Sequence, residues 1–352
     1  MNIAIDISPL SSGHKVRGVG FYLLHLKDAL QKYFPQHSYT FFTDPKSIPQ
    51  NVNVVHYPYF DPYFQTLPLL KHHLTVVTVH DLTPLVFQKH FPAGIKGKLI
   101  WQLQKHLLKN VDGILTDSVC SKKDIHKLIG ISNEKISVVY LAAGETFQKL
   151  SEKAINKQAL FNKYGLPEYF ALYVGDVTWN KNLPRLMRAC ITQHVPLVMV
   201  GKALVEKDYD TANPWNVDRN IVIEIAEKNS NIYRLGFVEN DELVQLYNCA
   251  TVFAMPSLYE GFGLGVIEAM SCGCPVITSK EGSLPEVAGD AAEFVDAYNE
   301  ASIGEAIVEL FTDGRKRKEM VEKGLIQAKT FSWKKAAEQT LSFYQRIYET
   351  SH

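Results

Sequence analysis

The chain has 352 residues, more than one hydrophobic core usually supports, so its length predicts two domains. Its 37 Lys and Arg balance its 37 Asp and Glu, which argues against a nucleic-acid binder. Five cysteines without a CxxC pair fit a reducing cytoplasm better than a disulfide framework. No apolar run approaches the length of a membrane span, and no stretch looks like a signal peptide, so we expect a cytoplasmic protein.

The first β/α unit carries two glycines where its helix begins. Residues 1–7 alternate as a strand, and a polar loop, residues 8–17, leads to Gly18-Val19-Gly20. A dinucleotide fingerprint needs a tight turn and a third glycine, but Leu23 stands at that position and the loop is long. Asp44, at the end of the next strand, could still mimic a ribose-binding acid. A nicotinamide-dependent oxidoreductase (NAD-dependent, on a doubly wound fold) therefore stays an alternative.

A histidine follows the most apolar strand of the first half. Residues 74–79 form this strand, and His80 stands at its carboxyl end, the edge of an open parallel sheet where ligands bind. An imidazole can exchange hydrogen bonds with a sugar hydroxyl or assist at a reacting centre. We therefore predict a functional role for His80.

The segment 94–110 has the pattern of a basic amphipathic helix. Its apolar residues recur every four positions, at Ile95, Leu99, Leu103 and Leu107, with lysines elsewhere. Such a pattern usually covers a sheet, and we predict that this stripe is buried. The first 150 residues hold 16 Lys and Arg against 10 Asp and Glu, so peripheral contact with an anionic membrane surface stays open.

A second β/α series begins after a weakly patterned, polar stretch, residues 144–166. Its first strand, residues 169–175, is followed by a loop with Asp176 and Lys181 and then by a helix. A lysine at the start of a helix can meet a phosphate as a point charge. The polar stretch therefore predicts the junction of two domains.

The most informative stretch lies between residues 251 and 277. An apolar strand, residues 251–255, ends at Pro256, and a loop with three glycines and Glu260 leads into a helix that carries Glu268. The free amide groups and dipole of a helix N-terminus favour an anion, and carboxylates accept hydrogen bonds from sugar hydroxyls. We therefore expect both carboxylates to line one cleft, at opposite ends of a ligand.

This stretch resembles the Glu-x7-Glu signature of the retaining glycosyltransferases of family 4. The resemblance implies an α/β protein with the GT-B fold, in which two doubly wound Rossmann-like domains face each other across a cleft. The N-terminal, acceptor-side domain would be residues 1–150, with a C-terminal helix at about 333–352 that crosses back to it. Residues 151–332 would bind the nucleotide-sugar.

The resemblance also implies roles for individual residues. The catalytic residues would be Glu260, His80 and Lys181, and Asp176 stands where many relatives have a phosphate-binding arginine, so Arg185 or a first-domain residue would substitute. The donor would be bound by Gly18, Val19, Gly20, Lys181, Arg185, Phe237, Val238, Glu260, Phe262, Gly263, Leu264 and Glu268.

The residues after His80, together with residues 282–287, look most like the bacterial mannosyltransferase branch. This implies GDP-mannose as the donor and a polysaccharide, glycolipid or lipid-linked oligosaccharide as the acceptor; UDP-glucose, UDP-galactose and N-acetylated sugars stay open. No metal cofactor and no nucleic-acid partner are expected, and Asp208-Tyr209-Asp210 is interpreted as surface. Besides the oxidoreductase, Asp176 leaves open a catalytically silent scaffold that binds a sugar nucleotide.

Overall fold

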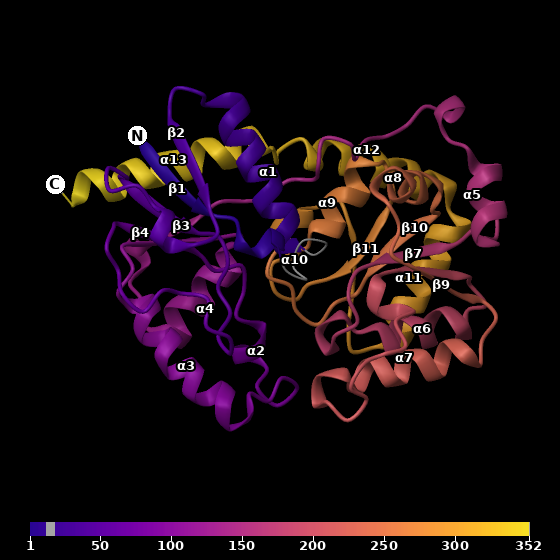
Figure 1. Cartoon of the computed structure of the whole chain (residues 1–352). Helices are drawn as coiled ribbons and strands as arrows, with labels where there is room; N and C mark the ends of the chain where they lie inside the picture. The colour runs from indigo at the N-terminus through magenta and orange to yellow at the C-terminus, as the bar shows by residue number, and fades with distance from the viewer. Residues whose placement is uncertain (12–17, 352) are drawn as a thin grey trace. The chain divides into compact units, whose positions relative to one another are not determined.

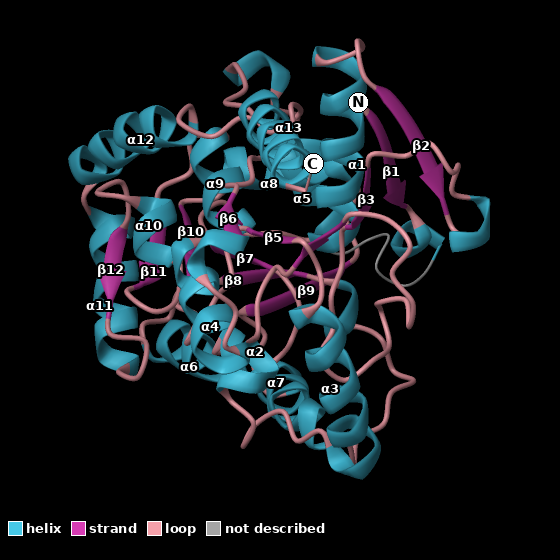
Figure 2. Cartoon of the chain, turned by 90° about the vertical axis from the view of Figure 1, so that its left-hand side faces the viewer, coloured by secondary structure: helices cyan, strands magenta, loops and turns pink. Residues whose placement is uncertain are grey.

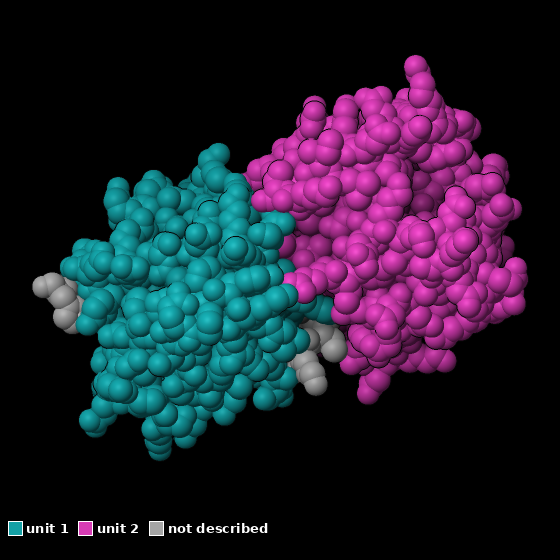
Figure 3. Space-filling model, turned by 90° about the horizontal axis from the view of Figure 1, so that it is seen from above, with its two compact units in different colours: residues 1–141, 331–352 teal, residues 142–330 magenta. Residues whose placement is uncertain are grey.

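The computed structural model describes residues 1–11 and 18–351. It divides into two compact units, Met1–Leu141 with Phe331–His352 and Ala142–Thr330 (Figures 1 and 3). The sequence-based boundaries were residue 150 and residue 332. Ser8–Ser11 forms a short 3-10 helix, and the rest of the predicted polar loop, residues 12–17, lies outside the described residues.

Unit 1 contains a six-stranded parallel sheet in the order β2-β1-β3-β4-β5-β6. Its strands are β1 (Asn2–Asp6), β2 (Ser38–Phe42), β3 (Val54–Tyr57), β4 (Thr75–Thr78), β5 (Gly113–Thr116) and β6 (Ile136–Val138). Its α-helices are α1 (Gly18–Tyr33), α2 (Thr83–Val86), α3 (Gly94–Lys109), α4 (Val119–Ile129) and α13 (Trp333–Thr350). Every residue of β3, β4 and β5 is buried, as expected where helices cover both faces of a parallel sheet.

The C-terminal helix α13 belongs to unit 1 although most of the chain separates it from β1 (Figure 1). It packs against α1, and Phe343 of α13 lies against Gly113 of β5. A Cβ on Gly113 would lie 2.5 Å from Cζ of Phe343, so only glycine allows this approach. The predicted return of the terminal helix to the first domain is confirmed.

Unit 2 repeats the architecture with the strand order β12-β11-β10-β7-β8-β9, again parallel. Its strands are β7 (Ala171–Val174), β8 (Leu197–Val200), β9 (Ile232–Gly236), β10 (Val252–Met255), β11 (Val276–Ser279) and β12 (Glu293–Val295). Its α-helices are α5 (Lys157–Tyr164), α6 (Leu183–Thr192), α7 (Val217–Glu227), α8 (Asn240–Cys249), α9 (Leu264–Ser271), α10 (Leu284–Ala288), α11 (Glu300–Thr312) and α12 (Gly314–Ala328).

Two parallel α/β sheets confirm the predicted fold class, and Figure 2 shows the strands among the helices. The predicted cleft between the domains stays a prediction. Over the described ranges, no helix is long and apolar enough to cross a bilayer.

One prediction about α3 is wrong. Its apolar stripe is exposed: the side chains of Ile95 and Leu99 are 84% and 69% accessible. The helix instead buries Gly97, Gln104 and Leu108, because the amide of Gln104 is needed to bind the backbone of a neighbouring loop.

Candidate active site

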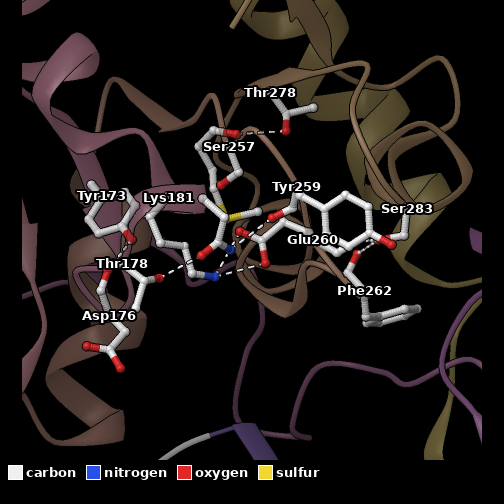
Figure 4. A network of polar contacts seen from close by, with 12 residues as sticks. Tyr173, Asp176, Thr178, Lys181, Ser257, Tyr259, Glu260, Phe262, Thr278 and Ser283 are labelled. Atoms are coloured by element: carbon white, nitrogen blue, oxygen red, sulfur yellow. Dashed lines mark hydrogen bonds and ion pairs between the residues drawn. The ribbon is translucent and has the colours of Figure 1, made fainter. Parts of the chain in front are cut away.

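The loop after β10 holds Glu260 in a fixed position. The hydroxyl of Ser283, which follows β11, donates to the carbonyl oxygens of Glu260 at 3.0 Å and Phe262 at 2.8 Å (Figure 4). Gly282 allows this approach, since a Cβ there would lie 2.6 Å from the carbonyl oxygen of Glu260. The side chain of Glu260 is 8% exposed, so its carboxylate is largely desolvated.

Lys181 is the partner of that carboxylate. Its Nζ lies 2.8 Å from both carboxylate oxygens of Glu260, and Figure 4 shows the two side chains pointing toward each other. The neighbouring Asn180 ties the loop after β7 to the loop after β10: its amide donates to the carbonyl of Tyr259 at 3.0 Å. The structure thus joins two of the three predicted catalytic residues, at the carboxyl edge of one sheet.

Asp176 lies in the same loop as Lys181 and is anchored by its backbone. Its carbonyl accepts a 2.7 Å hydrogen bond from the hydroxyl of Tyr173. Burial, and then the carboxylates of Glu260 and Asp176, raise the pKa of Tyr173 well above its usual value. Tyr173 therefore stays a neutral hydrogen-bond donor.

The helix after the Glu260 loop, α9, begins at an uncapped end. Gly263 precedes it in the left-handed region at φ 98°, which glycine adopts without strain, and no side chain caps the helix. One turn on, Glu268 is half-buried and accepts a 3.0 Å hydrogen bond from Tyr247. Burial raises the pKa of Glu268 from 4.5 to about 7, although the Tyr247 hydrogen bond acts in the opposite direction. Glu268 therefore changes charge near neutral pH.

The other predicted donor-binding residues of unit 2 lie along the same sheet edge. Arg185 donates to the side-chain oxygen of Asn182 at 2.8 Å, and Asn182 binds the carbonyl of Pro256, which precedes the Glu260 loop. Phe237 is 51% exposed and Val238 is buried. Both residues follow β9. Two strands, β7 and β8, lie between β9 and β10, so Phe237 and Val238 lie farther along the sheet edge from the Glu260 loop.

In unit 1, His80 follows β4 and contacts residues that follow the two strands on either side of β4. Its Nδ1 lies 2.6 Å from a carboxylate oxygen of Asp117, after β5, and its Nε2 lies 3.2 Å from the carbonyl of Pro58, after β3. A carbonyl and an ionised carboxylate only accept, so this arrangement fits an imidazolium in which both ring nitrogens donate. Burial is the largest influence and lowers the pKa of His80. The charge and hydrogen bond of Asp117, the charge of Asp81 and the bond to Pro58 together outweigh it, so the pKa lies above its usual value.

A buried hydrogen-bonded chain supports His80 from behind. Tyr344 of α13 bonds Nδ1 of His56 at 2.7 Å, Nε2 of His56 bonds the hydroxyl of Thr78 at 2.7 Å, and Thr78 bonds Tyr22 at 2.9 Å. The ring of Tyr22 meets the His80 ring edge-on, with centroids 4.8 Å apart. Burial lowers the pKa of His56 to about 3, so it stays neutral.

The glycines of unit 1 stand at the first turn of α1, after the carboxyl end of β1. Gly18 is exposed with open space around its Cα, Val19 is half-buried and Gly20 is buried. The described residues contain no cluster of three His, Cys, Asp or Glu that could hold a metal ion, and Asp208 and Asp210 are exposed in a loop.

Sequence reasoning missed Asp117, Tyr173 and Ser283 as parts of the site. Asp117 lies between β5 and α4. The signal that could have found it was its position: it directly follows a strand that neighbours the strand before His80.

Two family models match the chain: Glycosyltransferase Family 4 over residues 34–142 and Glycosyl transferases group 1 over residues 156–326. O-antigen chain mannosyltransferase B of Escherichia coli is 31% identical over 303 residues, which cover 83% of this chain and 74% of the relative. The serotype-specific mannosyltransferase WbdA of the same species is 27% identical, over 79% of this chain but only 34% of its own length.

Solved structures show the same fold. Sucrose-phosphate synthase from Thermosynechococcus elongatus superposes with a TM-score of 0.74 at 18% identity, covering 99% of this chain and all of the other. Anabaena HepE in complex with UDP-glucose superposes with a TM-score of 0.71 at 17% identity, covering 100% and 99%. These likenesses identify the GT-B fold, and nothing in them supports the oxidoreductase alternative. The chain belongs to the family 4 glycosyltransferases, among relatives that include bacterial mannosyltransferases.

Proposed function

We propose that the protein transfers mannose from GDP-mannose, with retention of anomeric configuration, to a glycan or lipid-linked acceptor. The observation that carries this proposal is the Lys181–Glu260 pair, in which both carboxylate oxygens lie 2.8 Å from the ammonium group. The choice of mannose is supported by the mannosyltransferase relatives. A nucleotide-sugar as the donor class is supported by the HepE complex.

In this proposal Lys181 meets the diphosphate of the donor, and Glu260 accepts hydrogen bonds from the sugar. As the leaving group gains negative charge, a positioned ammonium group and the N-terminus of α9 stabilise it. Because these groups and the backbone at Gly18, Val19 and Gly20 supply the donors, we propose that no metal ion is needed. Glu268 takes the ribose hydroxyls, and Arg185, Phe237, Val238, Phe262, Gly263 and Leu264 complete the donor site.

His80 would serve as a cationic hydrogen-bond donor toward the sugar being transferred. Its bond to Asp117 is short, but the bond from Nε2 to Pro58 is 3.2 Å, at the weak end of the range for such bonds. A substrate oxygen can replace the Pro58 carbonyl at Nε2 while Asp117 keeps the ring in place. The protein would work in the cytoplasm, in peripheral contact with the inner face of the membrane.

The test is a panel of nucleotides and nucleotide-sugars. GDP at about a hundred times its dissociation constant should stabilise the fold by about 3 kcal/mol, and UDP and ADP should do so less. GDP-mannose should support transfer that a chelator does not inhibit, and NMR of the product should show the donor's anomeric configuration. No shift with any nucleotide would contradict the proposal. Binding of GDP-mannose without turnover across an acceptor panel would favour the silent scaffold.

A further inference from the structure

Helix α3 of unit 1 presents its apolar side chains to solvent. Ile95 is 84% exposed, Leu99 69% and Leu103 38%, and their spacing of four residues places them on one stripe. The opposite side of the helix is buried through Gly97, where a Cβ would lie 3.6 Å from the Cβ of Tyr63, and through Gln104. The helix therefore leaves its apolar stripe in solvent and buries another side, which includes the polar Gln104.

The loop that α3 holds adds further exposed apolar side chains. The amide nitrogen of Gln104 donates to the carbonyls of Asp61 at 3.0 Å and Phe64 at 2.8 Å, and Lys71 donates to the carbonyl of Asn110, at the end of α3, at 3.1 Å. These bonds hold the loop against Gln104 within α3 and against Asn110 at the C-terminal end of the helix. Together, the exposed side chains Ile95, Leu99 and Leu103 of α3 and Phe64, Leu69 and Leu70 of this loop define the α3 face.

The charged side chains of α3 are all lysines, and the carboxylate of Asp61 in the loop accepts hydrogen bonds from Tyr59, Tyr63 and Phe64. The sequence has no Asp or Glu between Asp81 and Asp112, and the carboxylate of Asp112 is paired with Lys71 at 2.9 Å. Lys96, Lys98 and Lys109 of α3 are exposed. An apolar stripe bordered by lysines is the pattern of helices that lie in the interface of an anionic bilayer.

We propose that the α3 face docks this protein on an anionic phospholipid bilayer, with the apolar stripe at the boundary of head groups and acyl chains and the lysines on lipid phosphates. A second copy of the chain fits less well, because a twofold contact sets each patch against itself and would bring the lysines together. Anionic lipids attract the same lysines. The inference does not depend on which sugar or acceptor the enzyme uses.

The test is flotation of the full-length protein with vesicles. We expect binding to vesicles of roughly 3:1 phosphatidylcholine and phosphatidylglycerol to exceed binding to phosphatidylcholine alone by about tenfold or more. This binding should fall at ~0.5 M NaCl. Ile95→Glu combined with Leu99→Glu should reduce it by about tenfold or more, and Lys96→Ala combined with Lys98→Ala should reduce it while leaving stability unchanged.

The matched control is Ile326→Glu on α12, where the native side chain is also 69% exposed. This variant should bind vesicles like the native chain, and circular dichroism and the thermal shift with GDP should be unchanged in every variant. Equal binding to both vesicle types, or equal loss in Ile326→Glu, would overturn the proposal. So would self-association that Leu99→Glu abolishes in a protein that binds no vesicles. A missing GDP shift in the native chain would contradict the proposed function alone.

Discussion

At the scale of single residues, the Lys181–Glu260 pair is nearly desolvated, with side chains 20% and 8% exposed. Removing one partner of such a pair leaves the other charge buried without compensation. In the proposed function catalysis also depends on this pair, so variants have to separate the effect on turnover from the effect on stability.

We predict that Lys181→Ala and Glu260→Ala each lower turnover by about tenfold or more, because each removes a charged group aimed at the donor. Steady-state kinetics measure this, and chemical unfolding should show a stability loss of about 1–3 kcal/mol. Lys228→Ala is the control, since Lys228 belongs to an exposed pair with Glu224. Unchanged turnover in both variants of the buried pair would remove the site assignment.

The His80–Asp117 contact makes a second prediction. Asp117→Asn removes the charge that raises the pKa of His80, and burial then lowers that pKa. NMR titration should show the drop, and the alkaline limb of the activity profile should move to lower pH. In the native protein the stabilisation from protonated His80 is complete below about pH 6.5 and is lost as pH rises through the raised pKa. Asp112→Asn should leave His80 unchanged; a similar shift there would contradict the assignment.

Glu268 gives a dependence of stability on pH in the same direction, at lower pH values. Its pKa rises from 4.5 to about 7 on folding, so the folded protein holds a proton that the unfolded chain releases between these values. Stability should fall by about 1–3 kcal/mol across this range and then level off. Unfolding curves of Glu268→Gln should lack that fall. If the ribose binds the ionised form, calorimetry in buffers of different ionisation enthalpy should show proton release on GDP binding near pH 6.5.

At the scale of elements, α13 completes the buried chain behind His80. Tyr344→Phe removes the partner of Nδ1 of His56, a side chain with no solvent exposure. We predict a loss of about 1–3 kcal/mol in the free energy of unfolding, since a buried polar atom is left without its hydrogen bond. Tyr169→Phe, at a position 60% exposed, should change stability little. If Tyr344→Phe lowered the free energy of unfolding as little as Tyr169→Phe, the hydrogen-bonded residues behind His80 would contribute no stability.

At the scale of the whole molecule, unit 2 is one continuous segment and unit 1 is assembled from two. We predict that a fragment of residues 142–330 unfolds cooperatively and is stabilised by GDP. A fragment of residues 1–141 should not fold, because the core of unit 1 includes Phe343 and Tyr344 of α13. Adding residues 331–352 through a flexible linker should restore folding, as circular dichroism would show. A folded 1–141 fragment would contradict this account.

The sequence alone determined the strand positions and the return to a second β/α series, and it indicated Glu260, Lys181 and His80 as candidate site residues. These features are local: apolar runs, proline and glycine breaks, and polar residues at strand ends. The tertiary structure decided which side chains contact one another and which stay exposed. Asp117 reaches His80 because β4 and β5 are neighbours, and the stripe of α3 is exposed because Gln104 binds a loop on the inner side. Such choices depend on which surfaces meet, and helical periodicity cannot tell which side of a helix will find a partner.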